Sequence, residues 1–151
     1  MSPLYARTHA ARVEVDSLVG SSPADAEAAV TGLLALARGV HDKRLRKVVE
    51  MIESESLESV HALALEVNLS SSHLQHLFKQ QTGVCITQVL SEQRLRKAAR
   101  LLETSDLSVK EIAFAAGYEH ASSFIRAFHR RFAQTPRDYR LQNLKQTLLT
   151  K

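Results

Sequence analysis

Polar side chains suited to hydrogen bonding with bases occur in two similar stretches of the chain. Gln75 and His76 lie in the first stretch, and Arg126 lies in the second. A glutamine amide fits the hydrogen-bonding edge of adenine and an arginine guanidinium fits that of guanine, so these residues suit the reading of base edges in a DNA major groove. Whether Gln75, His76 and Arg126 can reach a DNA groove depends on the secondary-structure elements that carry them.

Other reactive residue types give weaker signals. His73 and His76 are spaced to share a metal ion, but no third ligand is near them and Cys85 is the chain's one cysteine, so we expect no metal. A thiol at a helix start could sense redox state, although a weakly capping, partly buried Cys85 is the simpler expectation. The sequence contains no nucleophile elbow and no glycine-rich phosphate loop. We therefore expect neither an enzyme nor a bound cofactor.

Composition favours a helical protein of the cytoplasm. The 151 residues include 5 Gly, 3 Pro and 1 Cys. So few turn formers argue against an all-β fold, and a single cysteine excludes an internal disulfide and suits a reducing compartment. The first residues lack the apolar core of a signal peptide, and no apolar stretch is long enough to span a bilayer. We expect a soluble protein with no membrane partner.

Positive charge gathers at the C-terminal end. Residues 121–151 contain seven basic residues and one acidic residue, a net charge of +6, whereas the other 120 residues sum to −2. A basic end on a near-neutral body is typical of an anion-binding face, and a solvated basic tail is the alternative.

Helix start and stop signals divide the chain from residue 42 onward into short helices. Ser59 and Ser70 are placed to cap helices over 60–67 and 71–81, and Ser108 forms a capping box with Glu111 for a helix that reaches residue 116. A long helix is expected over 86–103 and another over 121–132. A last helix starts at Thr135-Pro136 and is expected to fade after about residue 144. Before them, an Ala-rich extension over residues 1–41 contains one predicted helix over about 24–38, with the apolar stripe Val30, Leu33, Leu34 and Ala37.

An internal repeat relates two of these helix pairs. The stretch SVHALALEVNL (59–69) matches SVKEIAFAAGY (108–118), and the match continues into the following helix. A short helix, a tight turn and a second helix form the helix-turn-helix shape, in which the first helix braces the second against a major groove. Apolar residues give each second helix its inner face, and its outward positions are short or polar: Ser71, Ser72, Gln75 and His76 in one copy, and Ser122, Ser123 and Arg126 in the other.

At this point the chain resembles the DNA-binding domain of the AraC/XylS family of bacterial transcription regulators. The resemblance is carried by RLRKVVEMI (44–52), EVNLSSSHLQHLFKQQTG (66–83), RLRKAARLL (94–102), SDLSVKEIAFAAGYE (105–119) and SSFIRAFHRRFAQTPRDYR (122–140). It implies an all-α domain of seven helices over 42–142. Two helix-turn-helix subdomains, about 59–82 and about 108–132, are joined by a linker helix over about 86–103. The extension 1–41 precedes the domain, and a tail follows over 143–151.

The resemblance also implies roles for individual residues. Seven positions that read bases in the family fall on Ser72, Gln75, His76, Ala121, Ser122, Ile125 and Arg126. Candidates for contacts with DNA phosphates are Lys79, Arg96, Lys110, Arg130, Arg131, Arg137 and Arg140. Departures from the family pattern are Asn68 and Ala133 in place of glycines, His120 where an aspartate cap is common, and Val89 in place of an aromatic residue. We expect a strained or shifted turn at Ala133 and a poorer cap at His120.

The expected function is a sequence-specific DNA-binding transcription regulator, an activator as is usual in the family. The expected partners are double-stranded promoter DNA, RNA polymerase by family resemblance, and a second copy of the chain through the helix over 24–38. Such a regulator would work in the bacterial cytoplasm at the nucleoid. A helical protein-interaction module, or an anti-regulator on the same scaffold, is the alternative.

Overall fold

A computed structural model describes residues 40–54 and 59–150 of the chain. In this part every regular element is a helix: α3 (Lys43–Glu53), α4 (Val60–Glu66), α5 (Ser71–Thr82), α6 (Ile86–Thr104), α7 (Val109–Ala115), α8 (Ala121–Phe132) and α9 (Pro136–Leu149). These seven helices confirm the predicted all-α class. The helix predicted over 24–38, and the dimer contact expected from it, lie outside the described residues. No described helix combines the length and hydropathy needed to cross a bilayer.

Side-chain caps start the helices where the sequence predicted. The hydroxyls of Ser59 and Ser70 accept from the backbone N–H three residues on, at the starts of α4 and α5. Ser108 and Glu111 form the capping box of α7, and the Thr135 hydroxyl caps α9. Because each cap satisfies backbone donors that a helix start leaves unpaired, these helix starts are set locally.

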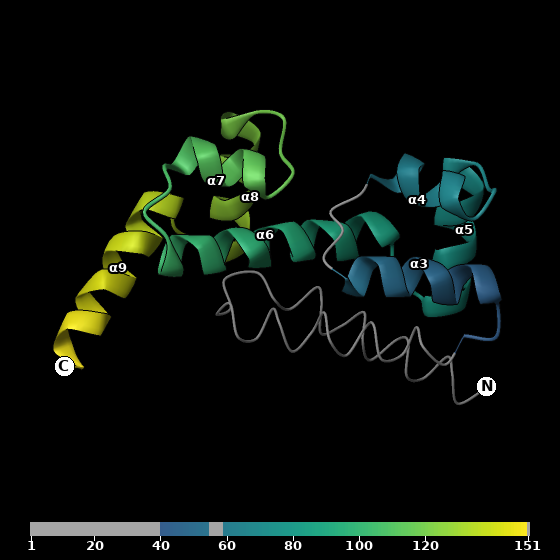
Figure 1. Ribbon diagram of the computed structural model, residues 1–151, viewed down its shortest axis with the longest axis horizontal. Coiled ribbons are helices and arrows are strands. Elements are labelled where there is room, and N and C mark those ends of the chain that lie inside the picture. The colour runs from purple at the N-terminus through teal and green to yellow at the C-terminus, as the bar shows by residue number, and fades with distance from the viewer. Residues whose placement is uncertain (1–39, 55–58, 151) are drawn as a thin grey trace.

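Two separate apolar cores lie at the two ends of α6. The first core joins α3, α4 and α5 to the start of α6, and Leu45, Leu63 and Phe78 lie at its centre. The second joins the later part of α6 to α7, α8 and the start of α9 around Ile112 and Phe128. Aromatic rings of α8 and α9 contact one another in this second core, in edge-to-face and tilted arrangements. The linker helix α6 therefore belongs to both subdomains, and Figure 1 shows it running between them.

Helix α9 is longer than predicted. The sequence suggested a helix that fades after about residue 144 and a tail over 143–151, but α9 continues to Leu149. Residues 141–149 contain no glycine or proline to stop the helix, and the side chains of Asn143 and Thr147 each donate back to a carbonyl four residues earlier. Near its start, the Tyr139 hydroxyl donates to the Glu103 carboxylate of α6, and burial of the phenol raises the pKa of Tyr139.

Left-handed backbone occurs at both departures from glycine. Asn68 has a φ of 57° in the turn between α4 and α5, as predicted, and Ala133 has a φ of 58° after α8. Asparagine tolerates this conformation, whereas the Cβ of alanine is crowded there. The turn at Ala133 is thus strained rather than moved, because helix α8 still ends at Phe132.

Candidate nucleic-acid interface

Helix α5 turns its polar residues outward. Its buried residues are Leu74, Phe78 and Thr82, which hold the helix on the first core. Ser72, Gln75, His76 and Lys79 are all exposed on the opposite side. The helix is fixed at its start by the Ser70 cap and at its end by Gly83 in the left-handed conformation. The inner apolar face and the outer polar face predicted for the first copy are therefore both present.

Helix α8 repeats this arrangement with a more basic outer face. Phe124, Phe128 and Phe132 are buried. Ser122, Ile125, Arg126 and Arg130 are exposed, and Ala121 is half-buried. The His120 side chain makes no capping hydrogen bond to α8, which confirms that it caps the helix poorly.

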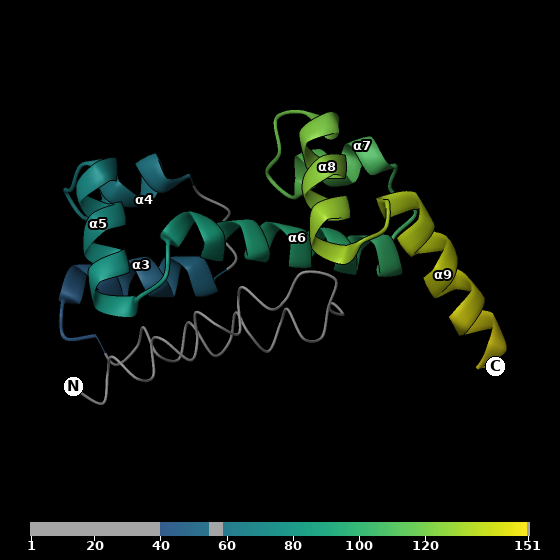
Figure 2. The same cartoon turned by 180° about the vertical axis from the view of Figure 1, so that it is seen from behind.

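The two outward-facing helices lie on one side of the molecule. In Figure 2, α5 and α8 run in the same sense, each with its start at the end away from α6. The 19 residues of α6 span about 28 Å at about 1.5 Å per residue. That length is close to one turn of B-DNA, about 34 Å. Helix α6 therefore sets the two helix-turn-helix subdomains apart along its length.

Arg131 corrects the predicted set of phosphate contacts. Its side chain is 6% exposed, and its Nε lies 2.8 Å from Oε1 and 2.9 Å from Oε2 of Glu92 on α6. The guanidinium also lies over the Phe132 ring, 5.0 Å from its centroid. A side chain buried in this way cannot reach a phosphate, so Arg131 holds α8 on α6 instead.

Arg140 is half-buried and has partners within the protein. Its guanidinium donates to the carbonyl oxygens of Leu102, Ser105 and Leu107, at 3.4, 3.5 and 2.6 Å. These carbonyls belong to the end of α6 and the loop that follows, where a helix leaves backbone acceptors unpaired and a cation is favourable. The arginine therefore ties α9 to the α6–α7 junction.

The other phosphate candidates divide by exposure. Arg96 is half-buried on α6, with its Nε atom fully buried. Four candidates have exposed side chains: Lys79, Lys110, Arg130 and Arg137. Three of these four belong to the second subdomain and its flanking helix. Lys79 alone belongs to the first.

Two other sequence candidates can be placed. Cys85 is half-buried at the start of α6 and makes no capping hydrogen bond. His73 and His76 are exposed on α5, and the described residues contain no group of three potential metal ligands. Sequence reasoning passed over a basic cluster on α3, whose signal was the run KRLRK at residues 43–47.

Comparison with known proteins decides the family. A family model described as a helix-turn-helix domain matches residues 63–142. The chain belongs to the AraC/XylS family. Among curated AraC/XylS relatives, the transcriptional regulator GlxA of Rhizobium meliloti is 34% identical over 131 residues, covering 85% of this chain and 40% of GlxA. The transcriptional activator RhaS of Shigella boydii is 36% identical over 99 residues, covering 64% of this chain and 36% of RhaS. The chain thus spans about two fifths of the length of these relatives.

Solved structures of AraC-type domains share the fold. The DNA-binding domain of AdpA, a global transcriptional factor crystallised with a target DNA, superposes with a TM-score of 0.59 at 32% identity, covering 67% of this chain and 93% of that one. The C-terminal domain of the response regulator yesN from Fusobacterium nucleatum gives 0.59 at 29% identity, covering 66% and 99%. The described helices therefore form an AraC-type DNA-binding domain with two helix-turn-helix subdomains.

Proposed function

We propose that this protein is a sequence-specific transcription regulator, an activator, that inserts α5 and α8 into successive major grooves of promoter DNA. The observation that carries the proposal is the pairing of two outward-facing helices on one side of α6 (Figure 2). Gln75 on α5 and Arg126 on α8 are both exposed, within the first two turns of their helices. Both side chains are able to pair with a base edge through two hydrogen bonds. The name of RhaS, a transcriptional activator, supports activation.

The exposed residues of the two subdomains divide into base contacts and phosphate contacts. Gln75 and Arg126 make the direct base contacts, and Ser72, His76 and Ser122 adapt to more than one base. Ile125 and Ala121 can touch only apolar groups such as a thymine methyl. Lys79, Lys110, Arg130 and Arg137 hold the phosphate backbone, which sets position but does not read sequence.

Two protein partners complete the proposal. An activator works by contacting RNA polymerase, and we propose this contact from the family resemblance. We also propose a homodimer through the segment over residues 24–38, which lies outside the described residues. The dimer would pair two copies of the bipartite reader on DNA.

Binding to DNA gives the test. Selection from a random duplex pool should return a bipartite site with two conserved patches about one helical turn, ~10 base pairs, apart. If about six phosphates are neutralised, the logarithm of the affinity should fall with the logarithm of salt concentration at a slope of roughly −5. An affinity independent of salt would contradict the proposal and favour the protein-interaction alternative. A selection that returns no preferred sequence would contradict specific readout.

A further inference from the structure

The first subdomain has few groups to hold DNA. A bipartite reader needs backbone contacts at both of its half-sites, because these contacts fix register and orientation. Among the phosphate candidates with exposed side chains, Lys79 alone lies in the first subdomain. Further backbone contacts by the first subdomain must therefore come from residues outside α5.

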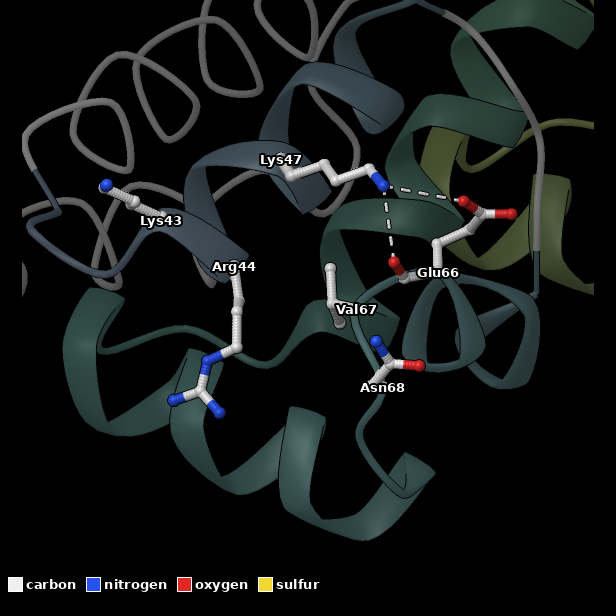
Figure 3. A pocket seen from close by; sticks show the side chains of 6 residues that line it. All are labelled: Lys43, Arg44, Lys47, Glu66, Val67 and Asn68. Atoms are coloured by element: carbon white, nitrogen blue, oxygen red, sulfur yellow. Dashed lines mark hydrogen bonds and ion pairs between the residues drawn. The ribbon is translucent and has the colours of Figure 1, made fainter.

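A basic hollow beside α5 offers such residues. It lies between α3 and the turn that joins α4 to α5, and it has a volume of about 490 Å³. Figure 3 shows the side chains around it. The lining consists of three cations, one carboxylate and two turn residues: Lys43, Arg44, Lys47, Glu66, Val67 and Asn68. Three positive charges against one negative charge give this wall a net charge of +2.

The existing partner of Lys47 is a weak competitor for an anion. The Lys47 ammonium lies 3.6 Å from the Glu66 carboxylate and 3.3 Å from the Glu66 carbonyl oxygen. Arg44 is held more firmly, because its Nε and Nη2 donate to Oδ1 and Oδ2 of Asp42 at 3.2 and 2.9 Å and the Asp42 side chain is 18% exposed. The side chains of Lys47 and Glu66 are 54% and 57% exposed, and exposed pairs of this kind contribute little to stability. A phosphate can therefore enter the hollow at small cost.

The hollow is next to the part of α5 that enters the groove. Asn68 lines it and stands two residues before Ser70, the cap of α5. Exposed Ser72 and Gln75 follow within the first turns of that helix. A DNA strand that flanks a groove entered by these side chains would therefore run near the α4–α5 turn and the basic wall.

The second subdomain shows that the fold does not require this cluster to be exposed. The tetrapeptide RLRK occurs at residues 44–47 and again at 94–97. In the first copy its three cations are exposed, whereas in the second copy they are half-buried on α6. In the repeat, Ala115 takes the place of Glu66 and Gly117 that of Asn68. The solvated basic wall is a property of the first copy alone.

We propose that this hollow binds a backbone phosphate of the DNA strand that flanks the major groove read by α5. Lys43 and Lys47 supply mobile ammonium groups, and Arg44 supplies a guanidinium beside them. This assignment rests on the proposed DNA-binding function and extends it by one contact surface that the recognition helices do not contain.

The test compares two double variants of the full chain on the selected duplex. Lys43→Ala/Lys47→Ala removes two cations of the hollow. Arg46→Ala/Lys145→Ala removes the same charge from exposed positions on α3 and α9 that do not line it. Each lost phosphate contact should weaken binding about fivefold at about 0.15 M salt and reduce the salt slope by about 0.9. Because the hollow holds one phosphate, we expect about fivefold weaker binding with unchanged base preference for the first variant, and at most twofold weaker binding for the control. Equal losses in the two variants would overturn the proposal.

Duplexes with single neutral methylphosphonates locate the contact. One substitution flanking the first half-site should weaken binding of the unaltered protein and leave that of Lys43→Ala/Lys47→Ala unchanged. If every substitution affects both proteins equally, the hollow holds no DNA phosphate. Binding of inorganic phosphate that the variant abolishes, with DNA affinity intact, would assign the hollow to a small anion and likewise overturn the proposal. Absence of salt-dependent DNA binding by the unaltered protein would instead refute the proposed function itself.

Discussion

Arg130 and Arg131 are neighbours on α8, and the structure gives them opposite roles. Arg130 is exposed, whereas Arg131 is buried against Glu92 of α6. Arg131→Ala should therefore destabilise the fold, and Arg130→Ala should weaken DNA binding. The two substitutions remove the same side chain and the same charge from adjacent positions, so each serves as the control for the other.

The magnitude follows from burial. The side chains of Arg131 and Glu92 are 6% and 12% exposed, and the guanidinium lies within 2.9 Å of both carboxylate oxygens. Removing one member of a buried pair leaves the other charge desolvated, which costs about 3–5 kcal/mol. Because Glu92 keeps some contact with solvent, we expect about 3 kcal/mol for Arg131→Ala. Arg130→Ala should change stability by less than about 0.5 kcal/mol, as is usual for an exposed side chain.

Urea unfolding and salt-dependent DNA binding separate the two effects. Arg130→Ala should reduce the salt slope by about 0.9 with an unchanged unfolding midpoint. Arg131→Ala should lower the midpoint and, where the protein is folded, keep the slope. Replacing the pair by Glu92→Leu/Arg131→Met should recover most of the lost stability, since apolar residues can substitute for a buried ion pair. If Arg131→Ala is as stable as the unaltered protein and loses salt slope instead, Arg131 is a phosphate contact and the burial argument is wrong.

Three further perturbations test other parts of the molecule. Gln75→Ala and Arg126→Ala should each lose about 1–3 kcal/mol of discrimination at one base position, measured on single-base variants of the selected site; unchanged preference in both would contradict the placement of α5 and α8. Ala133→Gly should raise the free energy of unfolding by about 1 kcal/mol because it relieves a left-handed alanine, whereas Ala115→Gly in α7 should lower it by a similar amount. The Ser108 backbone N–H donates to Glu111 and lowers the pKa of that carboxyl. The ionised Glu111 carboxylate therefore stabilises the fold above the ordinary pKa of glutamate, and this stabilisation is lost as the pH falls through the lowered pKa of Glu111. The difference in free energy of unfolding between the unaltered protein and Glu111→Gln should therefore disappear below about pH 4.

Helix boundaries were predictable because caps are local signals. Ser59, Ser70 and Ser108 each bond to a backbone N–H three residues away, so the sequence window that contains the cap also contains its partner. The repeat pattern then showed which helices pair. The apolar face of α5 followed from the same short-range periodicity. The end of α9 was missed because no stop signal marks it, and polar residues there were mistaken for a tail.

Roles that depend on distant partners were not predictable. Arg130 and Arg131 are both arginines near the end of α8, and only the packing of that helix on α6 shows which of them turns inward. Their sequence neighbourhood does not contain Glu92, which lies 39 residues away. The contacts of Arg140 could not be predicted for the same reason, since its carbonyl acceptors lie 33 to 38 residues earlier. Charge type identifies a candidate phosphate ligand, and tertiary contacts decide whether it is available.

Contacts between residues distant in the sequence also hold α6 in place between the two helix-turn-helix subdomains. Residues from Ile86 to Leu90 are packed into the first core, and residues from Leu95 to Leu102 into the second. Between them, the buried Gln93 amide donates to the Ile52 carbonyl at the end of α3, and Glu92 binds Arg131 on α8. Neither subdomain can rotate about α6 without breaking a buried polar contact, and leaving such groups unpaired is costly. The distance between α5 and α8 is therefore set by one continuous helix, so under the proposed function the spacing of the two half-sites would contribute to recognition.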